Sequence, residues 1–226
     1  MPRMGPDSAP LSLVLASASP RRQRLIAWLG LPVEALPVDV DEPLDAPLPP
    51  DAIAVDLAES KALAASAIEP EAVCLGFDTI VVLDGRPLGK PGSDDEARQM
   101  LDSLSGRHHF VVTGAAIAVG GRVIQSFAVQ TDVEMRTLHA DEVDRWLARG
   151  EHLGCAGAYN IEHHLARVTE DECFQNVAGL PLCHVYRTLA RLDDGSLRGL
   201  APPVERCDRA LRRRCRLGPR VCGLTP

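Results

Sequence analysis

Residues 73 to 83 of the chain read Val73-Cys74-Leu75-Gly76-Phe77-Asp78-Thr79-Ile80-Val81-Val82-Leu83. This run is apolar apart from one acid and one hydroxyl, and it predicts a strand. The pair Asp84-Gly85 that follows is typical of a hairpin turn. A strand that ends in a hairpin has an antiparallel neighbour, so its sheet is not purely parallel.

Further strands and helices are predicted on both sides of this run. The predicted strands cover 11–16, 33–40, 110–119 and 123–135. The predicted helices cover 21–29, 51–67, 93–106, 141–149 and 182–192, while 154–177 is mixed. Because helices alternate with strands but hairpins interrupt the alternation, we expect an α/β fold with a mixed twisted sheet and flanking helices.

The chain is organised as one domain with a segment at each end. It has 226 residues, 46% of them apolar, which is enough for one large core. Residues 1–10 are rich in proline, and we expect them to be disordered. Residues 11–192 hold the predicted strands and helices. Residues 193–226 form a C-terminal tail rich in arginine and cysteine, for which we expect weak structure.

Charge and hydropathy exclude several classes of protein. The net charge of −7 does not favour nucleic acid, although the arginines of the tail could contact RNA or a protein partner. No apolar run reaches the roughly 18–20 residues that span a bilayer, and the first ten residues lack the apolar segment of a secretory signal. We therefore expect a cytoplasmic protein without membrane association.

Asp78 is the acid inside the apolar strand. An unpaired charge is unfavourable to bury, so this carboxylate requires a cation, a metal ion or a cleft. In such a place it could hold Mg²⁺ or take a proton from water. The alternative is a carboxylate at a strand end or bulge that accepts hydrogen bonds from the backbone.

A second polar motif is Ser17-Ala18-Ser19-Pro20-Arg21-Arg22. Ser19 suits an N-cap and Pro20 suits the first turn of a helix. The free N–H groups of a helix start and the guanidinium of arginine both bind phosphate. Two arginines in the first turn oppose the helix dipole, and a bound polyanion would reverse that penalty. The alternative is two solvated arginines beside an ordinary cap.

Two lysines and one glutamate could complete a site for a polyphosphate. Lys61 lies within a predicted helix, and Lys90 follows the predicted hairpin. With the two arginines they could form a cradle of four cations for a triphosphate, and Glu42 could add a second carboxylate for a metal ion. Taken singly, each lysine is typical of a surface residue, and Glu42 is typical of a solvated acidic loop.

The cysteines and histidines are less specific. The adjacent pairs His108-His109 and His163-His164 lack the spacing of a helical zinc site, so we expect structural or surface roles. Ser105-Gly106 and Val112-Thr113-Gly114 could form turns at the edge of a cleft. A zinc or iron site could use Cys173, Cys183, His184, Cys207, Cys215 and Cys222, but their spacing contains no C-x-x-C pair, and we interpret them as scattered reduced thiols.

These motifs together resemble the Maf family of nucleotide pyrophosphatases. The resemblance covers the chain from residue 11 to about 192, and its motifs occur in family order. They are Ser17-Ala18-Ser19-Pro20-Arg21-Arg22, Glu42, Lys61-Ala62, Gly76-Phe77-Asp78-Thr79, Gly89-Lys90-Pro91, Ser105-Gly106, Val112-Thr113-Gly114, Ala156-Gly157-Ala158-Tyr159-Asn160-Ile161 and Asn176-Val177-Ala178-Gly179-Leu180-Pro181-Leu182.

The resemblance implies two lobes around a cleft, a divalent cation (Mg²⁺ or Mn²⁺) and a homodimer. It implies cleavage of a nucleoside triphosphate to a monophosphate and diphosphate, with a housecleaning role. Asp78 would be the general base and would bind the metal together with Glu42. The substrate-binding residues would be Ser17, Arg21, Arg22, Lys61, Thr79, Lys90 and Glu162.

The segment Ala156-Gly157-Ala158-Tyr159-Asn160-Ile161 is similar to the branch that acts on dTTP, UTP and modified pyrimidine nucleotides. Glu162 stands where that branch usually has glutamine, and an ionised glutamate accepts hydrogen bonds but cannot donate them. Two alternatives are a pyrophosphatase of the 7-methyl-GTP type and a non-catalytic nucleotide-binding regulator of septum formation.

Overall fold

The computed structural model of the chain describes residues 12–193 and 195–224. Residues 1–10, for which disorder was predicted, lie outside the described residues. The described residues form a seven-stranded sheet with the order β2-β1-β3-β5-β6-β7, and β4 pairs with β3. The strands are β1 (Leu13–Leu15), β2 (Val33–Ala35), β3 (Val73–Leu83), β4 (Arg86–Leu88), β5 (His108–Val119), β6 (Arg122–Met135) and β7 (Ala166–Arg167).

The sheet is mixed, as the hairpin signals predicted. β1 runs parallel to β2 and to β3. The pairs β3–β4, β3–β5, β5–β6 and β6–β7 are antiparallel. The long strand predicted from residues 73–83 is therefore the one at which parallel and antiparallel pairing meet.

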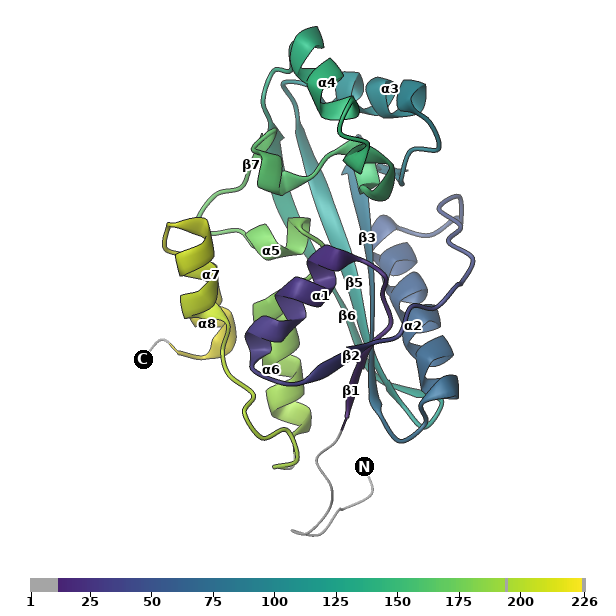
Figure 1. The fold of residues 1–226 in the computed structure, drawn as a ribbon, viewed down its shortest axis with the longest axis vertical. Coiled ribbons are helices and arrows are strands. Elements are labelled where there is room, and N and C mark those ends of the chain that lie inside the picture. Colours follow the sequence, from purple (N-terminus) through teal and green to yellow (C-terminus); the bar gives the residue numbers. More distant parts are fainter. Residues whose placement is uncertain (1–11, 194, 225–226) are drawn as a thin grey trace.

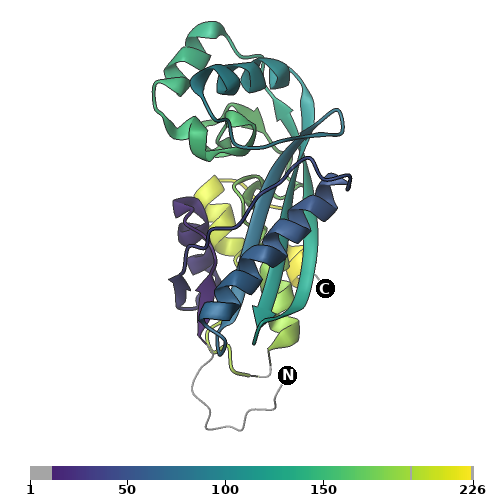
Figure 2. The same cartoon turned by 90° about the vertical axis from the view of Figure 1, so that its right-hand side faces the viewer.

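Helices flank both faces of the sheet. They are α1 (Pro20–Ile26), α2 (Pro50–Ile68), α3 (Asp94–Leu104), α4 (Ala140–Leu147), α5 (Phe174–Val177), α6 (Leu182–Leu192), α7 (Val204–Leu211) and α8 (Leu217–Cys222). Helix α2 covers one face, while α1 and α6 lie on the other (Figures 1 and 2). Helices α3 and α4 form a second lobe at the far end of the long strands (Figure 2).

Two glycines let α2 lie directly on the sheet. A Cβ atom on Gly76 of β3 would be 2.1 Å from the carbonyl oxygen of Ala58, and one on Gly114 of β5 would be 2.0 Å from that of Ala54. Ala54, Ala58 and Ala62 are all fully buried and present only methyl groups to the sheet. The helix backbone therefore touches the strands, which fixes the position of its polar side chains.

We expect Gly76→Ala to destabilise the fold by about 3 kcal/mol or more, because the new methyl group would overlap the backbone of α2 rather than a movable side chain. Urea unfolding measures this difference. Gly154→Ala is the matched control, since nothing lies within 4 Å of a Cβ atom at that position. The control should change stability by no more than about 0.5 kcal/mol, and equal effects of the two changes would contradict the close packing.

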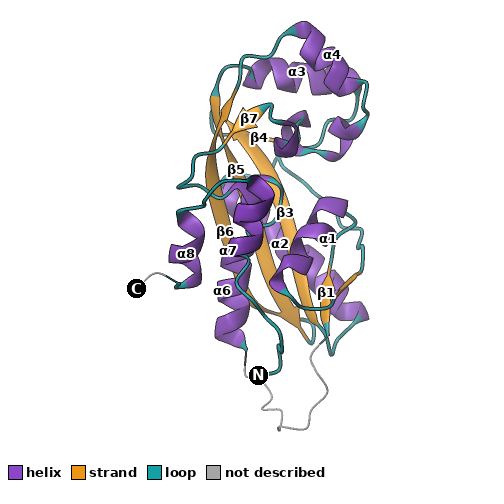
Figure 3. Ribbon diagram, turned by 60° about the vertical axis from the view of Figure 1, so that its left-hand side comes forward, coloured by secondary structure: helices purple, strands orange, loops and turns teal. Residues whose placement is uncertain are grey.

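The described part of the C-terminal tail contains two helices, so the expectation of weak structure was wrong there. Helices α7 and α8 lie beside α6 (Figures 1 and 3). Val204 of α7 and Val221 of α8 are buried and pack in one apolar cluster with Cys183 of α6. The arginines of both helices are exposed to solvent. Because the segment contains many charged residues, its few apolar residues did not suggest a folded structure in the sequence.

The structure differs from the prediction at Val112-Thr113-Gly114 as well. These residues lie inside β5 and not in a turn at a cleft edge. Gly114 has no side chain, and this allows α2 to pack directly on the strand at that point. The neighbouring Thr113 is completely buried. The glycine that suggested a turn therefore serves a helix–sheet contact.

His109 on β5 is buried, and its Nε2 lies 2.7 Å from the hydroxyl oxygen of Tyr159. Burial lowers the pKa of His109 from 6.5 to about 4. As the pH falls, the imidazole of His109 is protonated near pH 6.5 in the unfolded chain but only near pH 4 in the folded protein. The contribution of His109 to stability is therefore complete above pH 6.5 and is lost as the pH falls towards 4.

The loss amounts to about 3 kcal/mol over that range. We measure the free energy of unfolding with urea at pH 7 and at pH 4. Over this range it should fall by about 3 kcal/mol more in the unmodified protein than in His109→Gln. His108→Gln is the control, because the side chain of His108 is exposed. An unchanged pH dependence in His109→Gln would refute the assignment.

Candidate active site

Asp78 faces α2 because side chains alternate along β3. Phe77 and Val81 enter the main core, whereas Ile80 packs in the smaller cluster under α2. Asp78 shares the face of Ile80 and is only 6% exposed. Lys61 of α2 meets it there, with Nζ 2.6 Å from Oδ1.

Lys61 and Lys90 both contact Glu42. The Nζ atom of Lys61 lies 2.6 Å from Oε1 of Glu42, and that of Lys90 lies 3.1 Å from Oε2. Burial would raise the pKa of Glu42, but the hydrogen bond from Lys61 and the charges of both lysines outweigh it, so the pKa lies below its usual value. Cations and carboxylates thus alternate from Lys90 to Asp78.

Lys61 is not the surface lysine that its position in the sequence suggested. Its side chain is 8% exposed, whereas that of Lys90 is 54% exposed. Burial of Lys61 follows from the contact of α2 with the sheet at Gly76, which lies two residues before Asp78 on β3. The acid and the lysine are therefore brought together by backbone packing.

Helix α1 places Arg22 against the other face of β3. Ser19 caps this helix and Pro20 opens it, as predicted. Arg22 donates from Nη2 to the hydroxyl of Thr79 and from Nε to the carbonyl of Gly179, both at 2.9 Å. Burial lowers the pKa of Arg22, while the negative charge of Asp78 opposes that shift.

Ser17 precedes the helix and supports the same arginine. Its hydroxyl accepts hydrogen bonds from the backbone N–H of Ser19 at 3.2 Å and from Nη1 of Arg22 at 3.5 Å. Ser17 is 7% exposed. It therefore shapes the loop that leads from β1 into the cationic start of α1.

Arg21 lies beside Arg22 and has an unused donor. Its Nη1 donates to the sulfur of Cys155 at 3.3 Å, but its buried Nε has no hydrogen-bond partner among the described residues. A buried donor without a partner is unfavourable. A bound anion would satisfy it.

Thr113 and Asn176 are polar residues of this region that belong to the quoted sequence motifs but were not predicted as site residues. The hydroxyl of Thr113 lies 3.0 Å from that of Thr79 and donates to the backbone carbonyl of Asn176 at 3.0 Å. The side-chain amide of Asn176 donates to the carbonyl of Val129 at 2.9 Å and to that of Val111. A polar side chain within an apolar strand, as for Asp78, was the available signal for Thr113.

Glu162 stands apart from the cluster around Asp78. Its carboxylate pairs with Arg24 of α1, and its backbone N–H donates to Oδ1 of Asn160 at 3.1 Å. With Trp28 and Arg167 it lines a groove of about 880 Å³. Among the described residues, neither the side chain of Glu162 nor that of Arg21 hydrogen-bonds to another residue predicted for the site.

The fold and the site define an α/β protein in which cations from separate segments gather around two carboxylates, as expected for a protein that binds a polyphosphate. The chain belongs to the Maf family. A family profile described as Maf-like protein matches residues 12–192. The resemblance seen in the sequence motifs is therefore confirmed, and helices α7 and α8 lie outside the matched segment.

Similar proteins carry a more specific name. A protein of Chlorobaculum tepidum named dTTP/UTP pyrophosphatase is 42% identical over 187 residues, which cover 80% of this chain and 94% of that protein. One of Moorella thermoacetica with the same name is 45% identical over 182 residues, or 79% and 93% of the two chains. Among solved structures, a HAM1 protein from Coxiella burnetii aligns with a TM-score of 0.40 at 19% identity, over 55% of this chain and 73% of that one.

Proposed function

We propose that this chain is a nucleoside triphosphate pyrophosphatase that cleaves dTTP and UTP to the monophosphate and diphosphate. The observation that carries the proposal is the buried pair of Asp78 and Lys61, with Glu42 on the same ammonium group. The similar proteins that are named dTTP/UTP pyrophosphatase support the reaction and the pyrimidine substrates.

Four side chains are proposed to bind the triphosphate. Arg21 and Arg22 stand in the first turn of α1, where the positive end of the helix dipole also favours anions. Lys61 and Lys90 approach from α2 and from the loop after β4. The unpaired Nε of Arg21 supports this role, because a phosphate oxygen would accept its hydrogen bond.

Asp78 is proposed to be the general base. Lys61 donates to its Oδ1, and no hydrogen bond to Oδ2 is present among the described residues, so Oδ2 can accept a proton from water. The water oxygen forms a bond to the α phosphorus, and the bond from that phosphorus to the bridging oxygen breaks. Diphosphate leaves, with its charge compensated by the lysines and arginines.

The carboxylates of Glu42 and Asp78 suit a hard divalent cation such as Mg²⁺ or Mn²⁺. Glu42 and Asp78 are the residues that would hold the ion, because both carboxylates approach the same Lys61 nitrogen to 2.6 Å and so lie close together. Magnesium is often held by one or two carboxylates together with phosphate oxygens, and the described residues contain no ready group of three or more His, Cys, Asp or Glu ligands. Such an ion would polarise the phosphate and lower the pKa of bound water.

A nucleotide panel tests the function. Purified protein with Mg²⁺ or Mn²⁺ should release diphosphate and monophosphate from dTTP and UTP, faster than from GTP or 7-methyl-GTP. Without a divalent ion the rate should fall sharply. Preference for 7-methyl-GTP would assign the other branch, and nucleotide binding without turnover would favour the non-catalytic regulator.

Glu162→Gln tests the role of this position in base choice. Glutamine can donate a hydrogen bond to a base carbonyl, so we expect kcat/KM for dTTP and UTP to rise about 5-fold. The control is Arg24→Gln, which breaks the same ion pair without adding a donor at position 162. An equal rise in both variants would show that loss of the ion pair, and not the new donor, is responsible.

The family resemblance also leads us to propose a homodimer that works in the cytoplasm and removes unwanted nucleotides. None of the described helices is long and apolar enough to cross a membrane. Light scattering of the purified protein tests the dimer, for which the mass should be twice that of the chain.

A further inference from the structure

The two arginines in the first turn of α1 use their hydrogen-bond donors differently. Arg22 donates from Nε to the carbonyl of Gly179 and from Nη2 to the hydroxyl of Thr79, both at 2.9 Å. Its Nη1 donates to the hydroxyl of Ser17 at 3.5 Å. The Nε–Nη2 edge of a guanidinium is one that binds a phosphate with two parallel hydrogen bonds, and in Arg22 the protein already occupies it.

Arg21 keeps the same edge free. Its Nη1 donates to the sulfur of Cys155 at 3.3 Å. Its Nε is buried without a hydrogen-bond partner, and its Nη2 makes no hydrogen bond to any described residue. The N–H of Nε and one N–H of Nη2 point in the same direction, so together they can bind two oxygens of one phosphate. Arg21 therefore has the hydrogen-bonding capacity for a phosphate that Arg22 lacks.

Cys155 belongs to the second lobe, whereas Arg21 lies on α1 in the first lobe (Figure 1). The short helix η2 (Glu151–Gly154) precedes Cys155 and contacts α3 and α4. His152 of η2 is 1% exposed, and its Nε2 lies 2.8 Å from Oδ1 of Asp94 at the start of α3. The hydrogen bond from Arg21 to Cys155 therefore connects the two lobes.

The thiol of Cys155 is oriented to accept this hydrogen bond. Its S–H donates to the backbone carbonyl of Glu151 at 3.2 Å, so a lone pair of the sulfur is available to Arg21. Cys155 is only 1% exposed, which excludes water from the sulfur. An uncharged acceptor orients the guanidinium without cancelling its charge, whereas a carboxylate at this position would compete with a bound phosphate.

We propose that Cys155 is a positioning residue of the active site, which holds Nη1 of Arg21 so that the Nε–Nη2 edge is presented to the triphosphate. This inference rests on the proposed function and refines it, because it assigns different roles to the two arginines. Arg21 binds the phosphate through hydrogen bonds. Arg22 stabilises the contact of α1 with Thr79 and Gly179, and contributes its positive charge.

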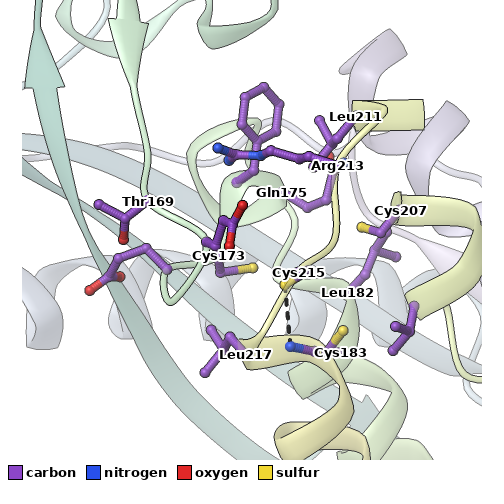
Figure 4. Close-up of a pocket in the computed structure, with 15 residues that line it drawn as sticks. Thr169, Cys173, Gln175, Leu182, Cys183, Cys207, Leu211, Arg213, Cys215 and Leu217 are labelled. Atoms are coloured by element: carbon purple, nitrogen blue, oxygen red, sulfur yellow. Dashed lines mark hydrogen bonds between the residues drawn. The ribbon is translucent and has the colours of Figure 1, made fainter. Parts of the chain in front are cut away.

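A matched control comes from the other cysteines, all of which are free thiols. A cavity between the Maf domain and the C-terminal helices is lined by Cys173, Cys183, Cys207 and Cys215 (Figure 4). Cys207 lies on α7, outside the segment that the Maf profile matches, and is 7% exposed. No described arginine donates a hydrogen bond to its sulfur. Cys207→Ala therefore removes a buried thiol without affecting an arginine of the site.

Binding of the non-hydrolysable α,β-imido analogue of dTTP, measured by titration calorimetry with Mg²⁺, tests the proposal without turnover. Cys155→Ala should raise the Kd about 3- to 10-fold, which corresponds to the loss of one orienting hydrogen bond. Cys155→Ser should stay within about 2-fold of the unmodified protein, because a hydroxyl also accepts a hydrogen bond. Cys207→Ala should leave the Kd unchanged.

A double-mutant cycle separates positioning from a general effect on structure. Arg21→Lys removes the Nε–Nη2 edge and should raise the Kd about 10-fold or more with little change in Tm. In that background Cys155→Ala should have no further effect on the Kd, because the guanidinium that it orients is absent. Arg22→Lys should instead lower the Tm by about 4 °C, since it disrupts the hydrogen bonds to Thr79 and Gly179.

Three outcomes would overturn the positioning role. They are an unchanged Kd in Cys155→Ala, an equal loss of affinity in Cys155→Ser, and the same effect of Cys155→Ala with and without Arg21→Lys. Failure of the proposed function is recognised separately. If the analogue binds with the expected pattern but dTTP is not hydrolysed, the proposed function fails while the role of Cys155 holds.

Discussion

Asp78→Asn should lower kcat for dTTP about 10²–10⁴-fold while KM changes little, if Asp78 takes the proton from the attacking water. Asparagine keeps an oxygen that can accept the hydrogen bond from Lys61, so the contact at 2.6 Å can persist. What is lost is the basic lone pair of a carboxylate. The effect should therefore appear in turnover more than in substrate binding.

Diphosphate release under saturating substrate measures this loss. Asp84→Asn is the matched control, because Asp84 lies in the turn directly after the same strand and pairs with Arg107 at the surface. The control should retain normal turnover. Near-normal activity of Asp78→Asn would remove the assignment of Asp78 as the base.

Lys61→Met should be the most destabilising of the changes at the site, by about 3 kcal/mol. Methionine fills similar volume but leaves Asp78 charged, only 6% exposed and without its cation. Glu42 is partly exposed, so water can solvate its carboxylate when Lys61 is removed. The expected loss of stability therefore arises mainly from the buried charge of Asp78. Urea unfolding at pH 7 measures the difference.

Lys90→Met is the control for this prediction. Lys90 contacts the same Glu42, but its side chain is 54% exposed. Exposed ion pairs contribute about 0–1 kcal/mol, so this variant should remain nearly as stable as the original protein. The double change Lys61→Met with Asp78→Asn should recover part of the loss, since no buried charge would remain. A loss that is unchanged in the double variant would show that packing, and not charge, is responsible.

Local patterns were sufficient to predict much of the fold. The apolar run at 73–83 with its hairpin signal predicted β3 and the mixed sheet, and Ser19-Pro20 predicted the start of α1. These features depend on side-chain periodicity, capping and turn preferences within a few residues, which a sequence displays directly. The strand predicted at 33–40 proved to be shorter, at Val33–Ala35, because it pairs with only three residues of β1.

Long-range packing decided what the local patterns left open. The sequence favoured a surface position for Lys61, yet contact between α2 and Gly76 buries it beside Asp78. The arginine-rich tail suggested weak structure, yet Val204 and Val221 cover Cys183. In each case the outcome depends on a partner far away in the chain.

The chemistry of the site was therefore determined by the sequence, through an acid in an apolar strand and two arginines at a helix start. The tertiary structure alone decided that Lys61 would neutralise that acid, that Glu162 would pair with Arg24, and that Val204 and Val221 would pack against Cys183. The physical reason is that ionisation and hydrogen-bonding capacity belong to single residues. Pairing and burial depend instead on which surfaces come into contact when the chain folds.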